Sequence, residues 1–196
     1  MLSARNLAYE RQFRPVFAPL SLELGSGELL LVSGANGSGK TTLLRLLAGV
    51  LRPAAGQVDN RASGTLYIGH QLGLKDDLTV RENLRFASTI IGGRGDVDAA
   101  LARLGLKALS GRPARNLSAG QRKRCALARL LLADTALWLL DEPYNNLDSE
   151  GMGVLDELLD AHRSAGGACV LASHGQPRPS GGAVRELALK PAGVAP

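Results

Sequence analysis

GANGSGKT, residues Gly34–Thr41, is the stretch of sequence that decides the fold. It comes directly after the apolar run ELLLVSG and opens KTTLLRLLAGV, residues 40–50, in which leucines recur at helical spacing. The pattern G-x-x-x-x-G-K-[ST] between a strand and a helix is that of a phosphate-binding loop. Its glycines let backbone N–H groups approach phosphate oxygens, and the helix N-terminus adds a positive dipole. The stretch therefore predicts a strand, a nucleoside-phosphate loop and a helix in succession.

Two side chains of this loop carry its chemistry. We expect Lys40 to bring its charge to the β- and γ-phosphates, and Thr41 to offer its hydroxyl to Mg²⁺. The alternative, a glycine-rich turn with an incidental lysine, leaves the strand before it and the helix after it unexplained. The residues expected to contact the nucleotide here are Gly34, Ala35, Asn36, Gly37, Ser38, Gly39, Lys40, Thr41 and Thr42.

Three further apolar runs end in polar residues. TLYIGHQ ends at Gln71, ALWLLDE ends at Asp141 and Glu142, and ACVLASH ends at His174. Continuous apolar runs of this length suit strands that are buried on both faces, as in a parallel sheet covered by helices. Ligands of such sheets bind beyond the carboxyl ends of the strands. The sequence therefore predicts an α/β fold in which the four runs point to one shared site.

The remaining segments predict what surrounds this core. SARNLAYE and APLSLELGSGE alternate between apolar and polar residues, which favours a small N-terminal antiparallel sheet. GVLDELLDAHRSAGG, residues 153–167, has a helical pattern, and so do TVRENLRFASTII and DVDAALARLGL, with Thr79 and Asp96 as caps. We expect a single domain over residues 1–196, with a core of residues 1–71 and 117–196 and a helical subdomain of roughly residues 72–116.

The acid pair at the end of ALWLLDE suits phosphoryl transfer. Asp141 is expected to hold Mg²⁺ through a water, because this cation takes oxygen ligands and keeps several waters. Glu142 is the candidate for polarising the attacking water, because the reaction needs an oriented nucleophile. Two solvated acids that merely end a strand are the alternative, which the phosphate loop upstream disfavours.

NLSAGQRKRCALARLLL, residues Asn116–Leu132, combines a helix start with a cluster of positive charge. Ser118 and Gln121 fit a capping box. The box explains neither Gly120 in the first turn nor the cations Arg122–Arg124 near the positive end of a helix dipole. A phosphate docked at this helix N-terminus would explain both. Because the phosphate loop already holds the chain's own nucleotide, we expect a two-fold dimer in which Ser118 faces the partner's γ-phosphate.

Composition restricts the class of protein. With 196 residues, 45 % of them apolar, the chain suits one domain with a buried core. Its net charge of +5 fits nucleotides, nucleic acid or a membrane surface and selects none of them. The N-terminus has no apolar signal core and the longest apolar region, Leu127–Leu140, holds charged residues, so we expect neither a secretory peptide nor a membrane span. Cys125 and Cys169 are expected to be core residues in a reducing compartment.

Taken together, these motifs resemble the ATP-binding cassette (ABC) ATPases. The resemblance implies a RecA-like phosphate-loop core, bound ATP and Mg²⁺, and a dimer with a second copy of the chain. By it, Gln71 links the helical subdomain to Mg²⁺ and the attacking water, Asp148 lies in a loop that crosses the dimer interface, and His174 contacts the γ-phosphate. LSAGQ resembles the signature motif that binds the partner's nucleotide through Ser118, Ala119, Gly120 and Gln121. The elements that carry the resemblance are Gly34–Thr41, Gln71, Leu117–Gln121, Leu137–Glu142, Asp148 and His174.

Within that family the chain is similar to the ATPase subunits of bacterial cytochrome c maturation systems. Ala119 stands where the family usually has glycine, and YIGHQLGLKDDLTVRENLRF carries the same likeness. The resemblance implies a peripheral protein on the cytoplasmic face of the inner membrane, bound to CcmB-like and CcmC-like integral membrane subunits. ATP hydrolysis would there drive release of a haem-loaded chaperone, with membrane contact through the partners and no direct contact with nucleic acid.

Several points stay open at this stage. The aromatic residue that usually stacks on adenine is absent at the expected spacing, where Arg11 stands; Tyr9 or Phe13 could supply a ring, or Arg11 could stack instead. The loop before Asp148 reads NNL where small residues are more frequent in the family. The alternative functions are the ATPase subunit of another small-substrate transporter, an ABC ATPase acting on nucleic acid or ribosomes, and a nucleotide-binding scaffold without turnover.

Overall fold

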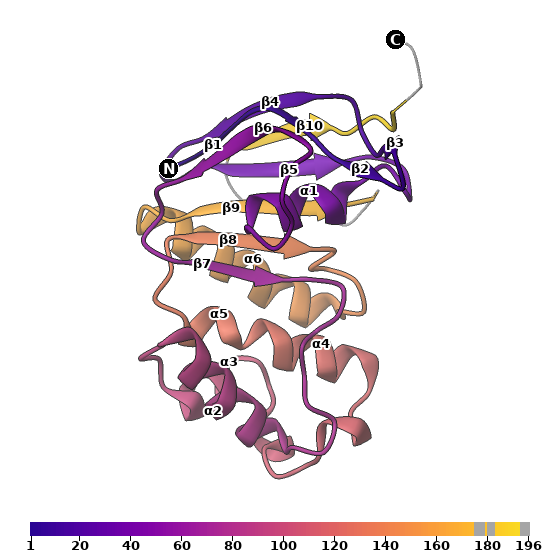
Figure 1. Cartoon of the computed structure of the whole chain (residues 1–196). Coiled ribbons are helices and arrows are strands. Elements are labelled where there is room, and N and C mark those ends of the chain that lie inside the picture. The colour runs from indigo at the N-terminus through magenta and orange to yellow at the C-terminus, as the bar shows by residue number, and fades with distance from the viewer. Residues whose placement is uncertain (175–178, 180–182, 193–196) are drawn as a thin grey trace.

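A five-stranded parallel sheet forms the centre of the structure, with the strand order β10-β5-β9-β8-β7 (Figure 1). This is a computed structural model, which describes residues 1–174, 179 and 183–192. All four apolar runs pair in parallel within this sheet, which confirms the expected core. The strands are β5 (Leu29–Ser33), β7 (Thr65–Ile68), β8 (Leu137–Asp141), β9 (Ala168–Ser173) and β10 (Val184–Ala188).

The central strand β5 is buried on both of its faces. Leu29 and Leu31 pack into one apolar core together with residues of α4, α5 and α6. Leu30 and Val32 point the other way, into a second core that contains the leucines of α1 and of the N-terminal strands. Successive side chains of a strand point to opposite faces, so a strand between two cores must be apolar throughout. This explains why the runs that form the sheet are unbroken.

The phosphate-loop helix α1 (Lys40–Leu47) contacts β8 and β9 on one side and β6 of the N-terminal sheet on the other. It ends three residues before the expected residue 50, because Gly49 adopts a left-handed conformation with φ of 70°. Figure 1 shows α1 lying between the two sheets. The helix start is thereby held firmly at the carboxyl end of β5.

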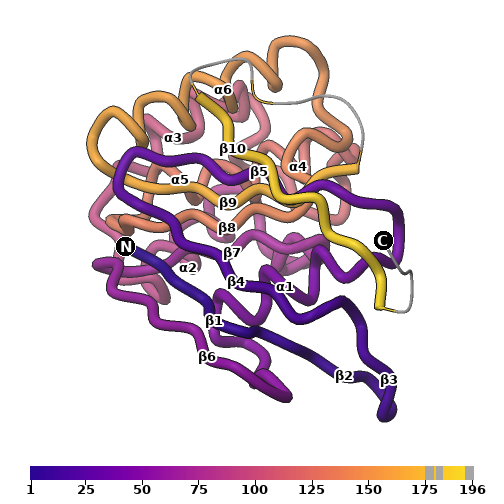
Figure 2. The backbone as a smooth tube through the Cα atoms, turned by 90° about the horizontal axis from the view of Figure 1, so that it is seen from above, coloured from indigo at the N-terminus to yellow at the C-terminus, as the bar shows by residue number. Residues whose placement is uncertain are grey.

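An antiparallel sheet forms the N-terminal layer, as expected. Its strand order is β4-β1-β6, and Figure 2 shows it on one side of the parallel sheet. The strand β6 was not expected from the sequence, because most of its residues are exposed and do not alternate. A two-stranded hairpin, β2 with β3, projects from the same layer. The bounds are β1 (Leu2–Ala8), β2 (Glu10–Arg11), β3 (Arg14–Pro15), β4 (Leu20–Leu24) and β6 (Ala55–Asn60).

Helices cover the other face of the parallel sheet and extend away from it. The expected caps are present: Thr79 forms a capping box with Glu82 before α2, and Asp96 caps α3. The helix expected over residues 153–167 begins earlier, at Ser149, because the Asp148 carboxylate accepts a hydrogen bond from the Gly151 N–H and caps it. The bounds are α2 (Val80–Ile91), α3 (Val97–Arg103), α4 (Ala119–Leu127), α5 (Arg129–Leu132) and α6 (Ser149–Ser164), with short 3-10 helices at Lys107–Leu109 and Ala114–Asn116.

Helices α2 and α3 lie at the end of the molecule opposite the antiparallel sheet (Figure 1). They contact each other and α5, which joins them to the sheet-covering layer. Among the residues that the structure describes, every helix is too short or too polar to cross a membrane.

Candidate functional site

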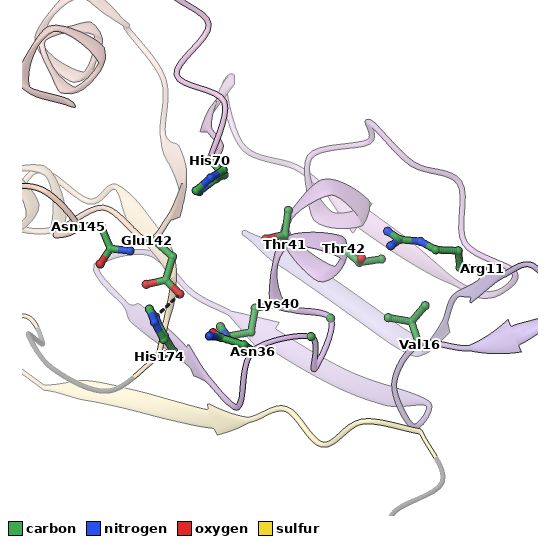
Figure 3. Close-up of a pocket in the computed structure, with 12 residues that line it drawn as sticks. Arg11, Val16, Asn36, Lys40, Thr41, Thr42, His70, Glu142, Asn145 and His174 are labelled. Carbon is green, nitrogen blue, oxygen red and sulfur yellow. Dashed lines mark hydrogen bonds and ion pairs between the residues drawn. The ribbon is translucent and has the colours of Figure 1, made fainter. Parts of the chain in front are cut away.

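A cavity of about 410 Å³ opens where β5, β8 and β9 end, directly above the phosphate loop. Figure 3 shows its lining side chains, which come from the loop, from the ends of two strands and from the N-terminal layer. We call it the phosphate-loop cavity. The loop contributes Asn36, Gly37, Gly39, Lys40, Thr41 and Thr42 to its lining.

Close packing fixes the shape of the phosphate loop. A Cβ at Gly34 would lie 2.6 Å from the Leu189 carbonyl oxygen, and at Gly39, where φ is 100°, one would lie 2.8 Å from a methyl carbon of Val16. Neither position tolerates a larger residue. Ser38 is fully buried, and its hydroxyl has no hydrogen-bond partner among the described residues. The loop thus holds an unused polar group beside the cavity.

Lys40 supplies the positive charge at the phosphate loop. Its ammonium group donates hydrogen bonds to the backbone carbonyls of Gly34 (2.7 Å) and Ala35 (3.1 Å). Only 7 % of Lys40 is exposed. A largely buried cation that is bonded to neutral carbonyls favours an anionic ligand, because no carboxylate neutralises it within these contacts.

Thr41 and Asp141 meet across the cavity floor. The Thr41 hydroxyl donates to an Asp141 carboxylate oxygen at 2.7 Å, and Asp141 is only 2 % exposed. Within the described ranges, no group of three or more His, Cys, Asp or Glu side chains could hold a metal ion by itself. Two oxygens beside a phosphate site nevertheless fit Mg²⁺, which is usually held by one or two protein ligands together with phosphates and waters.

Glu142 and His174 form the other side of the same cavity (Figure 3). The Glu142 carboxylate lies 2.9 Å from Nδ1 of His174. Glu142 has a left-handed backbone with φ of 48°, which costs a non-glycine residue about 1–2 kcal/mol. The turn places its side chain at the strand end, while its N–H still bonds to the Ala172 carbonyl at 2.9 Å. A strained acid in a cavity is typical of a functional position.

The structure places His70, rather than its neighbour Gln71, on the cavity wall. β7 ends at Ile68, so both residues lie past the strand in an irregular segment where strand alternation no longer decides the direction of a side chain. Asn145 also lines the cavity, from the turn after Glu142. Neither His70 nor Asn145 was predicted from the sequence as a lining residue. Their only signal was proximity to the ends of strands that carry expected site residues.

The end of the cavity away from the acids is formed by Arg11 and Val16 (Figure 3). The two rings considered for this position lie elsewhere. Phe13 is 98 % exposed at the tip of the β2–β3 hairpin, and Tyr9 packs against the second apolar core.

A second cavity, of about 250 Å³, lies at the N-terminus of α4, and we call it the α4 cavity. Ser118 accepts a hydrogen bond from the Gln121 N–H (3.2 Å), and the Gln121 side chain accepts one from the Ser118 N–H (3.0 Å), so the expected capping box is present. Ala119 is the first helical residue. Ser118, Gly120, Gln121, Arg124, Asn146 and Asp148 are among the lining residues.

The charged cluster of α4 is satisfied within the chain, which corrects one step of the sequence analysis. Arg122 pairs with Asp76 at 2.7 Å, Lys123 donates to the Glu142 carbonyl at 2.7 Å, and Arg124 pairs with Asp148 at 2.5 Å. A docked phosphate is not needed to explain these cations.

Gly120 has a local explanation as well. A Cβ there would lie 2.7 Å from the Asn146 carbonyl oxygen, so the close approach of the loop before α6 requires glycine. Packing within the chain thus accounts for the residue that seemed to need an external ligand.

Cys125 and Cys169 are buried free thiols in the apolar core, as expected. Burial raises the pKa of Cys125 to about 11 and that of Cys169 to about 12. Both therefore remain protonated and unreactive at neutral pH.

Comparison with known proteins connects the chain to one family. The ABC transporter family matches residues 17–145. Proteins named cytochrome c biogenesis ATP-binding export protein CcmA are 46 % identical: that of Xanthomonas campestris pv. campestris over 89 % of this chain and 87 % of its own length, and that of Pseudomonas putida KT2440 over 96 % of both. The CcmA protein of Methylococcus capsulatus is also 46 % identical, over 88 % of this chain and 90 % of its own.

Solved structures agree on the fold. A putative ATP-binding protein of an ABC transporter from Pyrococcus furiosus superposes with a TM-score of 0.81 at 21 % identity, covering 96 % of each chain. A dimeric ATP-binding cassette in a post-hydrolysis state with ADP and Pi gives a TM-score of 0.76 at 23 % identity, over 89 % of this chain and 88 % of that one. The chain therefore has the ABC ATPase fold.

Proposed function

Because the chain belongs to the ABC transporter family of ATP-binding proteins, we propose that its ATP hydrolysis drives a membrane complex of cytochrome c biogenesis. The chain binds ATP and is an ATPase, like the members of this family. The specific role rests on relatives that are 46 % identical over most of the chain and named for cytochrome c biogenesis.

The observation that carries the proposed reaction is that Lys40, Thr41 and Glu142 line one cavity, with Asp141 bonded to Thr41 behind it. Lys40 and the loop N–H groups would hold the β- and γ-phosphates, and the Thr41–Asp141 pair would hold Mg²⁺, with Asp141 acting through a water. The bound Mg²⁺ would neutralise phosphate charge. Glu142 faces the same space and would orient the attacking water.

His174 and Gln71 complete the proposed catalytic set. The hydrogen bond between His174 and the Glu142 carboxylate holds that acid in place, and His174 lines the cavity where the γ-phosphate would lie. Gln71 remains a proposed contact to Mg²⁺ and the water. Gln71 lies one residue beyond His70, which already lines the cavity. A small rotation of this segment would turn the Gln71 side chain into the cavity.

We assign the base of ATP to the end of the cavity formed by Arg11 and Val16. Glu142 and His174 mark the proposed γ-phosphate end, and the phosphate loop lies between the two ends (Figure 3). A guanidinium plane can stack on an aromatic base, and the Val16 side chain adds an apolar contact.

A second copy of the chain would complete each catalytic site. The α4 cavity offers the helix N-terminus, where Ser118 and Gln121 use each other's N–H groups and leave those of Ala119 and Gly120 for an incoming phosphate. Asp148 lies at the same cavity and would reach the interface. A two-fold dimer would place each α4 cavity against the partner's γ-phosphate.

The membrane partners would bind the helical subdomain of roughly residues 72–116, which we assign between the two parts of the core, residues 1–71 and 117–196. An apolar groove of about 260 Å³ lies between β7 and α2, and the exposed Phe86 (45 %) and Ile90 (67 %) belong to that face. We assign it to integral membrane subunits, CcmB-like and CcmC-like, at the cytoplasmic face of the inner membrane. Hydrolysis would then release a haem-loaded chaperone.

Glu142→Gln tests the assignment of the reaction. The amide keeps the shape of the side chain but loses the carboxylate, so we expect ATP binding within about twofold of wild type and hydrolysis at least about 100-fold slower. The dimer should accumulate in ATP, which size-exclusion chromatography with light scattering would detect. Wild-type turnover in this variant would overturn the role of Glu142.

The role in cytochrome c biogenesis is tested in cells. In the native host, replacing the chain with Glu142→Gln should abolish covalent haem in c-type cytochromes, measured by haem staining, while the apoproteins are still made. Normal holocytochrome levels would instead favour an ATPase subunit of another transporter.

A further inference from the structure

Lys123 is a buried cation that the proposed reaction does not use. It lies in the second turn of α4 and is 4 % exposed. Its ammonium group donates a hydrogen bond of 2.7 Å to the backbone carbonyl oxygen of Glu142, 19 residues away in the sequence. Lysine is rarely buried to this extent without a specific partner. The partner here is the peptide of the proposed catalytic acid.

The Glu142 peptide needs such an anchor. Its φ of 48° is unfavourable for a residue with a side chain, and the surroundings must hold it there. The N–H is fixed by the Ala172 carbonyl at 2.9 Å, and the carbonyl by Lys123 at 2.7 Å and by the Asn145 N–H at 3.3 Å. The bond from Lys123 is the shortest of these three, and Lys123 is the one partner of the three that lies in a helix.

The acid pair also helps to keep Lys123 charged. Burial lowers the pKa of Lys123 to about 8, while the nearby carboxylates of Asp141 and Glu142 favour its protonated form and Arg129 opposes it. At neutral pH the side chain therefore stays a cation behind the two acids.

We propose that Lys123 is a positioning residue: it holds the Glu142 peptide in its left-handed turn, so that the carboxylate meets His174 and the attacking water. This rests on the proposed function of Glu142. The same helix, α4, begins at the α4 cavity, where the partner's nucleotide would bind. Lys123 therefore connects this helix to Glu142, the acid that would act on the chain's own nucleotide.

A purely structural role would favour a different residue. Removing a buried charge removes its desolvation cost, which offsets the loss of one hydrogen bond to a carbonyl that keeps a second donor. Lys123→Met is therefore expected to fold with an unchanged or higher melting temperature. It leaves the Glu142 carbonyl with only the longer bond from Asn145.

The test uses four variants, of which the first three are compared in steady-state kinetics. Lys123→Met should lower kcat about 10- to 100-fold, because small displacements of a reacting group have effects of that size, and should leave KM within about twofold. Lys123→Gln retains an N–H donor and should recover part of the loss. Arg122→Met is the matched control, because the neighbouring cation bonds to Asp76 and to the Ala114 carbonyl, away from Glu142. It should keep kcat near wild type.

The fourth variant combines Lys123→Met with Glu142→Gln. If Lys123 acts through Glu142, single-turnover hydrolysis should be no slower in the double variant than in Glu142→Gln alone. Effects that multiply, a wild-type kcat in Lys123→Met, or a fall in kcat that accompanies a lower melting temperature would each overturn the proposal. A failure of the proposed function is seen separately, as wild-type turnover in Glu142→Gln.

Discussion

The phosphate-loop cavity and the α4 cavity lie on two sides of one loop, residues 142–148. Glu142 and Asn145 line the first, whereas Asn146 and Asp148 line the second. Both cavities begin at the N-terminus of a helix, and both have a cation beside it. They differ in what that cation does. Lys40 bonds to two neutral carbonyls, whereas Arg124 is already paired with the Asp148 carboxylate.

From this difference we propose that only the phosphate-loop cavity is a phosphate site by itself. The phosphate-loop cavity combines an uncompensated charge, loop N–H groups and acids that fit Mg²⁺. The α4 cavity keeps mainly the N–H groups of its first turn, because its charges hold the chain together. A helix N-terminus contributes about 0.3–1 kcal/mol to anion binding when exposed, which is too little to hold a nucleotide. We therefore propose that the α4 cavity contacts a phosphate only when the nucleotide is already held by the partner chain.

Lys40→Ala should have the largest effect on this comparison. Hydrogen bonds to charged groups contribute about 1.5–3 kcal/mol each, so ATP binding should weaken about 100-fold. Isothermal titration calorimetry with ATP and Mg²⁺ would measure it, and exposed Lys107→Ala is the control. Binding that survives in Lys40→Ala would mean that the α4 cavity holds ATP unaided, contrary to the contrast drawn above.

Ser118→Arg should separate binding from turnover. The added side chain fills the α4 cavity, so each chain should keep its own ATP affinity within about twofold, while hydrolysis falls at least about 10-fold because the partner's site is damaged. An excess of the variant should also inhibit the wild-type protein in mixed dimers. Ser164→Arg, at the exposed end of α6, is the control. A loss of ATP affinity in Ser118→Arg would mean that this serine serves its own nucleotide.

Local patterns made the phosphate-loop cavity and the helix caps predictable. The phosphate loop, the strand ends at Asp141 and His174, and the caps Thr79 and Ser118 are set by residues within a few positions of one another. Their spacing reports the geometry because strands, turns and helix starts are local structures. β6, whose exposed residues do not alternate, lacked such a signal, and neither the edge strand β10 nor the β2–β3 hairpin was predicted from the sequence.

The contacts of the second cavity were not predictable in this way. Arg122, Lys123 and Arg124 bond to residues 46, 19 and 24 positions away. No spacing rule links such pairs. The three cations therefore seemed from the sequence to be available to a ligand, although each of them has a partner within the folded chain. His70 and Gln71 show the same limit, because they lie past the end of β7, where strand alternation stops.

Gly120→Ala tests whether packing or phosphate access explains this glycine. A Cβ would meet the Asn146 carbonyl at 2.7 Å, so the loop before α6 must move, at a cost of about 1–3 kcal/mol that the better helix propensity of alanine offsets by about 1 kcal/mol. We expect a lower melting temperature and slower hydrolysis. Gly153→Ala, in α6 with open space around it, should instead be neutral or stabilising. An unchanged melting temperature in Gly120→Ala would mean that access of the phosphate, rather than packing, explains the glycine at this position.

Asp148→Asn should have the smallest effect, and its pH dependence decides whether the charge of Arg124 is used within the chain. The Gly151 N–H and the Arg124 guanidinium lower the pKa of Asp148 below its ordinary value. A carboxyl group with a lowered folded-state pKa stabilises the protein above its unfolded pKa and loses that contribution as the pH falls through the folded one. Asparagine can still cap α6, so thermal unfolding should show a small deficit at pH 7 that closes below about pH 4 and shrinks in high salt. A deficit that persists unchanged at low pH would mean that the ion pair contributes nothing. Arg124 would then be available to a phosphate, and the two cavities would differ less than their contacts indicate.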